Sequence, residues 1–515
     1  MKVQYSPQST KVQLVAVDFD PFEGPPIAKT FPVTEAQKEI WLSAQMSPEA
    51  NCAYNENLNV YLYGDVNVEF MLEAITLVID RHEALRSVFT SDGELMVVHT
   101  NEQNKPAYID LSYLPSSALR NQRLSEILAL NVDQPFDLYA GPLFKAQLLK
   151  LDANEFVLDL CGHHSVTDGW SLGIIVQYIS SIYSAKLLHA EPVLRPVVQF
   201  STYANDLAEY SKTQENRRVH LFWQKQFESN VPVLNIPVDR PYKSLRTYEG
   251  QRYDAIMDRQ LADAIKKMSA KQGATFVNTL FAMFEVFMYH LTQQTSLVIG
   301  LPSAGQSEAG YHHLVGHCVN LLPIRSEIEP SQTFGSFLAA RKSCMLDALE
   351  NQRFTFSKLL QTLTFERDPG RIPLVPVVFN IDMNIDDGVN FYTFRHLTTS
   401  NPRKFENFEL FINVTGHANN LTVEYSFNTW LFNPSTIQRF AAGFNNLCQA
   451  IVLNPNLPLS NYSLLTPNEL HKTLFDWNKT QRELPHDVFI QHYLENHAQQ
   501  NPEKPALVFE EQVFT

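Results

Sequence analysis

The sequence is poor in cysteine, has no long apolar run and has no excess of basic residues. Its five cysteines are scattered and form no CxxC pair, which argues against a disulfide framework or a zinc site. No stretch approaches the roughly 18 continuous apolar residues of a membrane helix, and the N-terminal residues lack the apolar segment of a signal peptide. We therefore expect a cytoplasmic protein with reduced thiols, no metal site and no membrane partner.

Charge and missing motifs exclude further classes of function. The 515 residues carry 55 acidic and 40 basic side chains, a formal net charge of -15. Because nucleic-acid-binding proteins usually carry a basic face, we expect no nucleic-acid partner. The chain also lacks a P-loop and a dinucleotide fingerprint after a predicted strand. We expect direct acyl transfer between two bound substrates and no covalent enzyme intermediate.

The segment CGHHSVTDGWS, residues 161–171, places two histidines beside each other. The apolar alternation of EFVLDLCG before it predicts a buried strand, and SLGIIVQYISSIYSAKLL after it predicts a helix with Ser171 as N-cap. His163 and His164 therefore lie on a strand-to-helix connection. Such a pair is often only hydrogen-bonded core, but a histidine at this place can also act as a general base, stabilise an oxyanion or orient a nucleophile.

Helices and strands alternate along most of the chain, which predicts a mixed α/β (α+β) protein. A chain of 515 residues exceeds one ordinary hydrophobic core, so several compact units are expected. A capping box of Thr34 and Gln37 begins the first predicted helix, and a second set of helices and strands of similar order begins near residue 250. The expected organisation is a linker over residues 1–30, lobes over 31–205 and 206–460, and a final segment, 461–515, that ends inside a predicted strand.

The histidine cluster resembles the HHxxxDG motif of condensation domains of non-ribosomal peptide synthetases, relatives of chloramphenicol acetyltransferase. Six further segments resemble boxes of that family in the family's order: TEAQKEIWL, RHEALRSVF, YANDLAEY, IGLPSAGQ, VGHCVNLLPIR and RFTFSKLL. The tail LLTPNELHKTLFDWNKT resembles the linker to an adenylation domain. The resemblance implies two chloramphenicol acetyltransferase-like lobes in a V-shaped pseudo-dimer, with residues 461–515 as a linker and the truncated start of an adenylation domain.

The resemblance also implies an activity and partners. The amine of an acceptor aminoacyl thioester would attack the carbonyl of a donor acyl thioester and form an amide. Phosphopantetheine arms of an upstream donor carrier protein and a downstream acceptor carrier protein would deliver the two thioesters, and no cofactor is expected on the domain itself. Because GLPSAGQSEAGYHHLVGHCVNLLPIR is most similar to condensation domains that follow polyketide modules, we expect a polyketide or β-amino acyl donor.

Within the motif, the resemblance assigns a different role to each residue. His164 is expected in the channel, where it orients the amine and takes its proton. A free α-amino group titrates near 7.7 to 8.0, so His164 need not be a strong base. His163 and Asp168 are expected to be structural, and Gly169 to supply a backbone conformation or close approach that a side chain would block.

Other residues are expected to line the channel or support the motif. The channel residues are Asn380, Asn320, Ser303 and Trp170. The family's usual arginine at the end of the fifth box, which pairs with the motif's aspartate, is replaced by Gln306. The partner of Asp168 must therefore be another residue or be absent, and Arg325 and Arg86 are the candidates.

Several alternatives stay open at this point. His312, His313 and His317 resemble metal ligands superficially, but no carboxylate or cysteine accompanies them at fixed spacing. Heterocyclisation domains replace the motif's histidines by aspartate, and epimerisation domains are not followed by an adenylation domain. The remaining rivals are a stand-alone acyltransferase on small molecules and a catalytically silent domain that only recruits partners.

Overall fold

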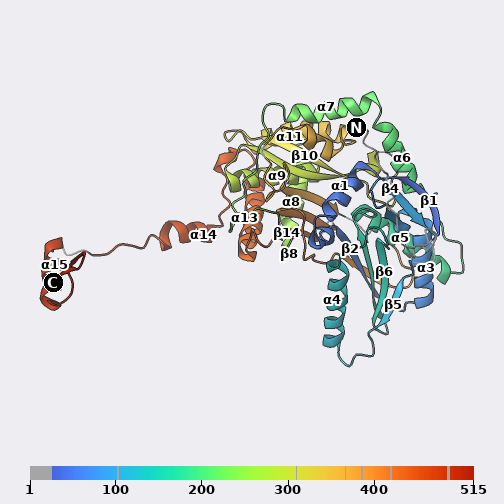
Figure 1. The fold of residues 1–515 in the computed structure, drawn as a ribbon, viewed down its shortest axis with the longest axis horizontal. Coiled ribbons are helices and arrows are strands. Elements are labelled where there is room, and N and C mark those ends of the chain that lie inside the picture. Colours follow the sequence, from blue (N-terminus) through green and yellow to red (C-terminus); the bar gives the residue numbers. More distant parts are fainter. Residues whose placement is uncertain are drawn as a thin grey trace, which may run out of the picture. The chain divides into compact units, whose positions relative to one another are not determined.

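The computed structural model describes residues 26–100, 104–308, 310–365, 367–383, 387–417, 420–483, 486 and 488–515. Contacts divide the chain into two units, Met1–Leu464 and Leu465–Thr515 (Figure 1). Most of the predicted N-terminal linker lies outside the described residues. Its last residues form strand β1, which pairs with β4, so regular structure begins a few residues earlier than predicted.

The first half of the large unit contains a sheet with helices on both faces. Its strand order is β12-β2-β7-β6-β5. Leu158 and Leu160 of β7 pack toward α3 and α5, whereas Val157 packs toward α4, so the apolar alternation seen in the sequence divides the strand between two cores. The elements are β2 (Asn55–Tyr63), α3 (Val68–Arg81), β5 (Ala107–Asp110), α4 (Ser117–Asp133), β6 (Phe144–Asp152), β7 (Glu155–His163), α5 (Gly169–Leu187) and β12 (Arg395–Thr399).

The second half contains a six-stranded sheet of order β10-β9-β11-β13-β14-β8. Helix α9 lies in the core of this half, with every residue from Thr279 to Tyr289 buried, as expected of a helix that is apolar on all sides. The elements are β8 (Gly250–Met257), α8 (Arg259–Lys271), α9 (Phe276–Thr292), β9 (Ser296–Ala304), β10 (Val319–Glu327), α11 (Phe334–Glu350), β11 (Val377–Met383), β13 (Leu410–His417), β14 (Asn420–Asn428) and α13 (Pro434–Leu453).

The two sheets repeat one pattern of strand pairing. The run β2-β7-β6-β5 has two antiparallel pairs followed by a parallel pair, and so has the run β8-β14-β13-β11. The sequence shows no matching repeat. The predicted mixed α/β class and the two lobes of similar order are therefore confirmed, with the duplication present in the architecture alone.

Two segments of the second half pack against the first. Strand β12 pairs with β2, and Phe391 and Phe394 before it pack on Tyr183 of α5. Segment 311–318 contributes Leu314 and Cys318 to the same apolar cluster as Phe200. These contacts bring residues near 316 beside the connection that carries the histidines.

The remaining elements of the large unit surround these sheets. A three-stranded sheet of order β1-β4-β3 extends the first half. The elements are β1 (Ile27–Pro32), α1 (Glu35–Ala44), α2 (Pro48–Cys52), η1 (Glu83–Arg86), β3 (Ser87–Phe89), β4 (Leu95–His99), α6 (Phe200–Tyr210), α7 (Gln214–Gln226), α10 (Gly305–Glu308), α12 (Phe356–Thr362) and η2 (Leu459–Asn461). Thr34 and Gln37 form the predicted capping box of α1.

The small unit consists of short elements. They are α14 (Pro467–His471), η3 (Lys472–Asp476), α15 (Ile490–Gln500), β15 (Leu507–Phe509) and β16 (Gln512–Phe514). The strand predicted at the end of segment 461–515 is instead two strands, because β15 and β16 pair antiparallel around a turn in which Glu510 has φ 54°.

Among the described residues, no single helix is long and apolar enough to cross a bilayer. Helices α8 and α9 reach that length and apolar character only together, as a pair bent by 105°.

Candidate functional site at the strand-to-helix connection

Asp168, and not Ser171, caps the helix that follows the histidines. The Asp168 carboxylate accepts hydrogen bonds from the Ser171 backbone N–H at 2.7 Å and from the Ser171 hydroxyl at 2.6 Å. The predicted N-cap was therefore three residues too late. A carboxylate at this position satisfies a free helical N–H and lies at the positive end of the helix dipole.

His163 lies in the core. Its side chain is fully buried between Tyr54 and Phe136, whose ring centroids are each 6.0 Å away. The Ser165 hydroxyl donates to Nδ1 at 2.8 Å, and burial lowers the pKa of the imidazole to about 3. His163 is thus a neutral ring outside the cavity, which supports the expected structural role.

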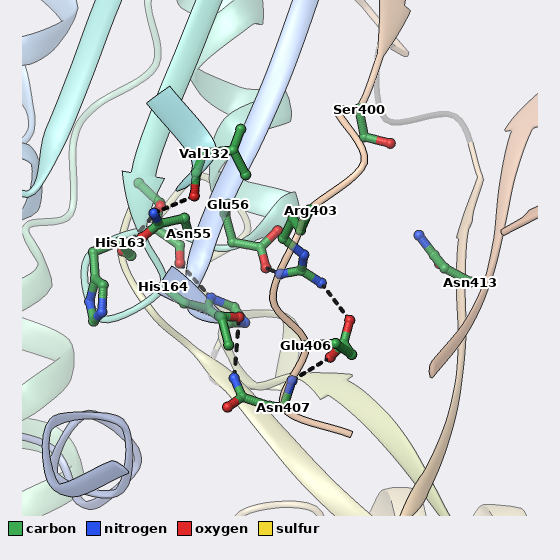
Figure 2. A network of polar contacts seen from close by, with 12 residues as sticks. Asn55, Glu56, Val132, His163, His164, Ser400, Arg403, Glu406, Asn407 and Asn413 are labelled. Carbon is green, nitrogen blue, oxygen red and sulfur yellow. Dashed lines mark hydrogen bonds and ion pairs between the residues drawn. The ribbon is translucent and has the colours of Figure 1, made fainter. Parts of the chain in front are cut away.

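His164 points in a different direction from His163 (Figure 2). Its Nδ1–H donates to the backbone carbonyl of Thr167 at 2.8 Å, and its backbone N–H donates to Tyr54 O at 2.7 Å. Because a carbonyl can only accept, Nδ1 carries the proton of the neutral ring and Nε2 keeps a lone pair. The ring lines a cavity and is therefore placed to accept a proton there.

The cavity has a volume of about 990 Å³ and is lined by both halves of the large unit. The first half supplies residues of α1, β2 and the start of α5, and the second half supplies residues of β9, β10, β11 and α12. A volume of this size suits a substrate-sized ligand. Its apolar lining includes Ile40, Ile174, Leu321, Phe356 and Val378.

Three of the four predicted channel residues line this cavity. They are Trp170, Ser303 and Asn380. Asn320 does not, because its side chain donates to the Gln352 carbonyl at 2.9 Å. The lining residues of β10 are its neighbours Val319 and Leu321, as the two-residue period of a strand requires.

Neither candidate arginine pairs with Asp168, which leaves the alternative that its partner is not an arginine. Arg86 donates to the backbone carbonyls of Asp80 and His99. Arg325 donates to Gln226 O and Asn230 O and pairs with Glu327. These guanidinium groups are already engaged.

A backbone N–H of the second half, and not an arginine side chain, donates to the second carboxylate oxygen of Asp168. The Cys318 backbone N–H donates to Asp168 Oδ2 at 3.1 Å. Burial raises the pKa of Asp168, and the bonds from Ser171 and Cys318 oppose that rise. Gln306 is fully buried, and neither atom of its amide has a hydrogen-bond partner among the described residues.

Gly169 begins α5 and lines the cavity. It is not among the glycines with positive φ. The positive-φ backbone conformation, one of the two roles expected of this glycine, is therefore absent, and the close approach stays a prediction.

The three histidines of segment 311–318 do not converge. Trp170 Nε1 donates to the His312 carbonyl at 3.0 Å, and Arg195 contacts the His313 ring at 2.7 Å. The His317 ring centroid lies 4.7 Å from that of His164. Within the described part of the chain no group of three His, Cys, Asp or Glu side chains could hold a metal ion.

One wall of the cavity is formed by charged side chains that the sequence did not predict as site residues. Glu56 of β2 pairs with Arg403 at 2.8 Å, and Arg403 contacts Glu406 at 3.4 Å (Figure 2). Burial, together with the nearby Glu56 carboxylate, raises the pKa of Asp382 to about 6, and a hydrogen bond from Asn380 at 2.7 Å opposes the rise. Two-residue spacing from Asn380 would have placed Asp382 on the same strand face, but nothing in the sequence joins Glu56 to Arg403.

Comparison with known proteins agrees with this geometry. The family model described as "Condensation domain" matches residues 27–474. Gramicidin S synthase 2 of Brevibacillus brevis is 30% identical over 497 residues, covering 95% of this chain and 11% of that protein. Tyrocidine synthase 3 of Brevibacillus parabrevis is 29% identical over 489 residues, covering 94% of this chain and 7% of that protein. The chain thus spans about a tenth or less of the length of these curated relatives.

Solved structures share the fold. The four-domain nonribosomal peptide synthetase holo-AB3403, bound to AMP and glycine, has a TM-score of 0.79 at 17% identity, covering 94% of this chain and 37% of that one. The condensation domain from the Monacolin K polyketide synthase MokA has a TM-score of 0.75 at 18% identity, covering 84% and 99%. With the family match over most of its length, the chain belongs to the condensation domain family, in the form carried by non-ribosomal peptide synthetases, as its motifs predicted.

Proposed function

We propose that this chain forms an amide between a carrier-bound acyl donor and a carrier-bound aminoacyl acceptor, with His164 as the catalytic residue. The observation that carries the proposal is the fixed His164 ring. Its Nδ1–H is bonded to Thr167 O, which leaves the Nε2 lone pair as the proton acceptor in a cavity lined by both halves.

The reaction proceeds by direct attack. The acceptor's amine nitrogen bonds to the donor's thioester carbon, and one N–H proton passes to His164 Nε2. Collapse of the tetrahedral intermediate breaks the C–S bond, and the departing thiolate takes the proton back from His164. Holding both groups in reacting geometry supplies much of the rate, so a modest base suffices.

The partners follow from the two thioesters. Donor and acceptor carrier proteins would present phosphopantetheine arms, and the domain itself needs no bound cofactor. We propose residues 31–205 and 206–460 as the two lobes and residues 461–515 as the linker and start of an adenylation domain in a longer cytoplasmic protein. The match of a four-domain synthetase to 94% of this chain supports that tail assignment.

We propose that the donor is a polyketide or β-amino acyl chain. Such a chain need not carry the α-amide of a peptidyl donor, so it suits apolar surface such as Leu321, Phe356 and Val378. The structural likeness to the condensation domain of the polyketide synthase MokA supports this choice. A site that requires a hydrogen bond discriminates far more strongly than one that merely accommodates a methylene.

The test uses the full chain with separately loaded acyl and aminoacyl carrier proteins. Mass spectrometry should find a new amide on the acceptor carrier, and His164→Ala should abolish it while the protein still folds. An active His164→Ala protein would refute the assignment of His164. Transfer to free amines but not to carriers would instead indicate a stand-alone acyltransferase, and binding without transfer a recruiting domain.

A competition experiment tests the donor. Matched polyketide-like and α-aminoacyl carriers should both be accepted, with weak discrimination between chains that differ by one CH₂. A strong preference for the α-aminoacyl donor would refute the subtype.

A further inference from the structure

A second histidine lies beside His164. His317 is 5% exposed and lines the cavity. Its ring meets that of His164 edge to face, with centroids 4.7 Å apart and an interplanar angle of 82°. Edge-to-face packing is a favoured arrangement of aromatic rings and restrains the rotation of both.

The backbone on both sides of His317 is held by the helix cap of the histidine motif. On one side, the Gly316 N–H donates to the Ser171 hydroxyl at 3.0 Å, and that hydroxyl lies 2.9 Å from the Gly316 carbonyl. On the other side, the Cys318 N–H donates to Asp168. Asp168 and Ser171 therefore fix the position from which the His317 side chain extends.

The close approach at Gly316 restricts this segment further. Gly316 has φ 151°, and a Cβ at this position would lie 2.0 Å from the Phe200 ring. Glycine is therefore required for the segment to reach the first half of the molecule. The Cys318 carbonyl is fixed as well, because it accepts the Gly305 N–H at 2.9 Å.

No hydrogen bond of the His317 ring is found among the described residues, and Nδ1 is buried without a partner there. Burial and the neighbouring His164 lower the pKa of His317 well below its usual value. The ring is thus neutral, and its aromatic ring contact among the described residues is with His164.

We propose that His317 is a positioning residue, which through its ring contact holds the His164 imidazole with Nε2 free in the cavity. The inference rests on the proposed function insofar as His164 performs the proton transfer. It gives Asp168 and Ser171 a specific task, which is to place His317 against His164.

The kinetic test compares His317→Phe, His317→Leu and His317→Ala. Phenylalanine keeps an aromatic edge, leucine keeps most of the volume, and alanine removes both. With acyl- and aminoacyl-pantetheine thioesters as probes, we expect kcat to fall about 10- to 100-fold in the leucine and alanine variants, the scale of a misplaced catalytic group. The acceptor KM should stay unchanged, and phenylalanine should restore most of kcat. Full activity of the alanine variant, or a phenylalanine variant as slow as alanine, would overturn the proposal.

His82→Ala is the matched control. His82 is also buried, has an unpartnered ring nitrogen among the described residues and packs against Tyr178 at 5.3 Å. It does not line the cavity. This variant should melt at a lower temperature than the parent but keep the parent kcat per folded molecule.

A double-mutant cycle tests the link through the helix cap. If Ser171 acts on the reaction through His317, the kcat loss in Ser171→Ala/His317→Ala should be smaller than the product of the two single losses. Independent, multiplying losses would contradict the link.

A substrate-free measurement separates this proposal from the proposed function. Histidine-selective ¹⁵N NMR should show His164 as a single Nδ1–H tautomer in the parent and in His317→Phe, and as mixed tautomers in His317→Leu. This readout needs no amide formation. An unchanged His164 spectrum in His317→Leu would overturn the positioning role even if the parent enzyme is fully active.

Discussion

The two halves of the large unit contain the same hairpin-and-helix element with different contents. In the first, β6 and β7 lead through the His164 connection into α5. In the second, β13 and β14 lead through residues 429–433 into α13, where Pro434 occupies the first turn. Asn428 at the end of β14 donates to Thr247 O at 2.7 Å and accepts the N–H groups of Trp430 and Leu431.

The two connections differ in whether a polar side-chain group remains available to a ligand in the cavity. The polar groups of Asn428 are used within the second half, and residues 428–433 do not line the cavity. The first connection leaves His164 Nε2 available and uses Asp168 to bind a segment of the other half. One backbone arrangement thus serves as support in the second half and, in the proposed function, carries the catalytic residue in the first half, because function depends on the site and not on the fold.

The largest effects should come from replacing His164 in the first connection and Asn428 in the second by alanine. His164→Ala should lower the amide-forming rate by about 10²- to 10⁴-fold with little change in melting temperature, because it removes a proton acceptor. Asn428→Ala should do the reverse and destabilise the fold by about 1–3 kcal/mol, since it leaves buried partners unpaired. Rate assays and calorimetry check both. An Asn428→Ala protein that folds stably but is inactive would break the comparison.

His163→Ala separates the two adjacent histidines. Removing a fully buried ring creates a cavity, so we expect a stability loss of about 2–4 kcal/mol, with the rate per folded molecule retained. Denaturant titration beside a single-turnover assay provides the measurement. Parent stability combined with loss of activity would move His163 into the chemistry.

Asp168→Asn tests whether the aspartate acts through backbone groups. Asparagine has one acceptor oxygen where aspartate has two. If that oxygen accepts from Ser171, the NH₂ group faces the Cys318 N–H, and this hydrogen bond is lost. We expect destabilisation by about 1–3 kcal/mol, measured by thermal unfolding. A variant that melts like the parent yet is inactive would show a catalytic role instead.

The smallest predicted effect concerns Asp382 of β11, a residue of the second sheet that lines the cavity. The pKa of Asp382, about 6, is raised above its ordinary value, so ionisation disfavours the folded state. The stability associated with the protonated form is complete below about pH 4 and is lost as pH rises through 6. Asp382→Asn should therefore match the parent near pH 4 and melt at a higher temperature above pH 7. Parallel melting curves at all pH values would contradict this.

The sequence predicted what local patterns encode. Period-two alternation in EFVLDLCG and the Thr34–Gln37 capping box were confirmed, and the family motifs led to the correct fold class. Helix caps were less certain, because Asp168 and Ser171 are both good caps and only the backbone geometry distinguishes them.

Long-range contacts could not be predicted. The bond from Cys318 to Asp168 joins residues 150 positions apart, and β12 crosses to a sheet whose other strands precede it by more than two hundred residues. Asn320 was misplaced for a different reason, because nothing in the sequence showed which face of β10 lies toward the cavity. The contact between His317 and His164 likewise depends on the packing of segment 311–318 against the first half.

The most direct test follows a labelled acyl group from one carrier protein to the other through a single turnover. Intact-mass spectrometry of the donor carrier, the acceptor carrier and the chain itself would be recorded in rapid-quench samples. Direct transfer predicts that the label leaves the donor and appears as an amide on the acceptor, while the mass of the chain never changes, and that His164→Ala stops this step. A labelled chain as an intermediate, or transfer at the parent rate by His164→Ala, would contradict the account.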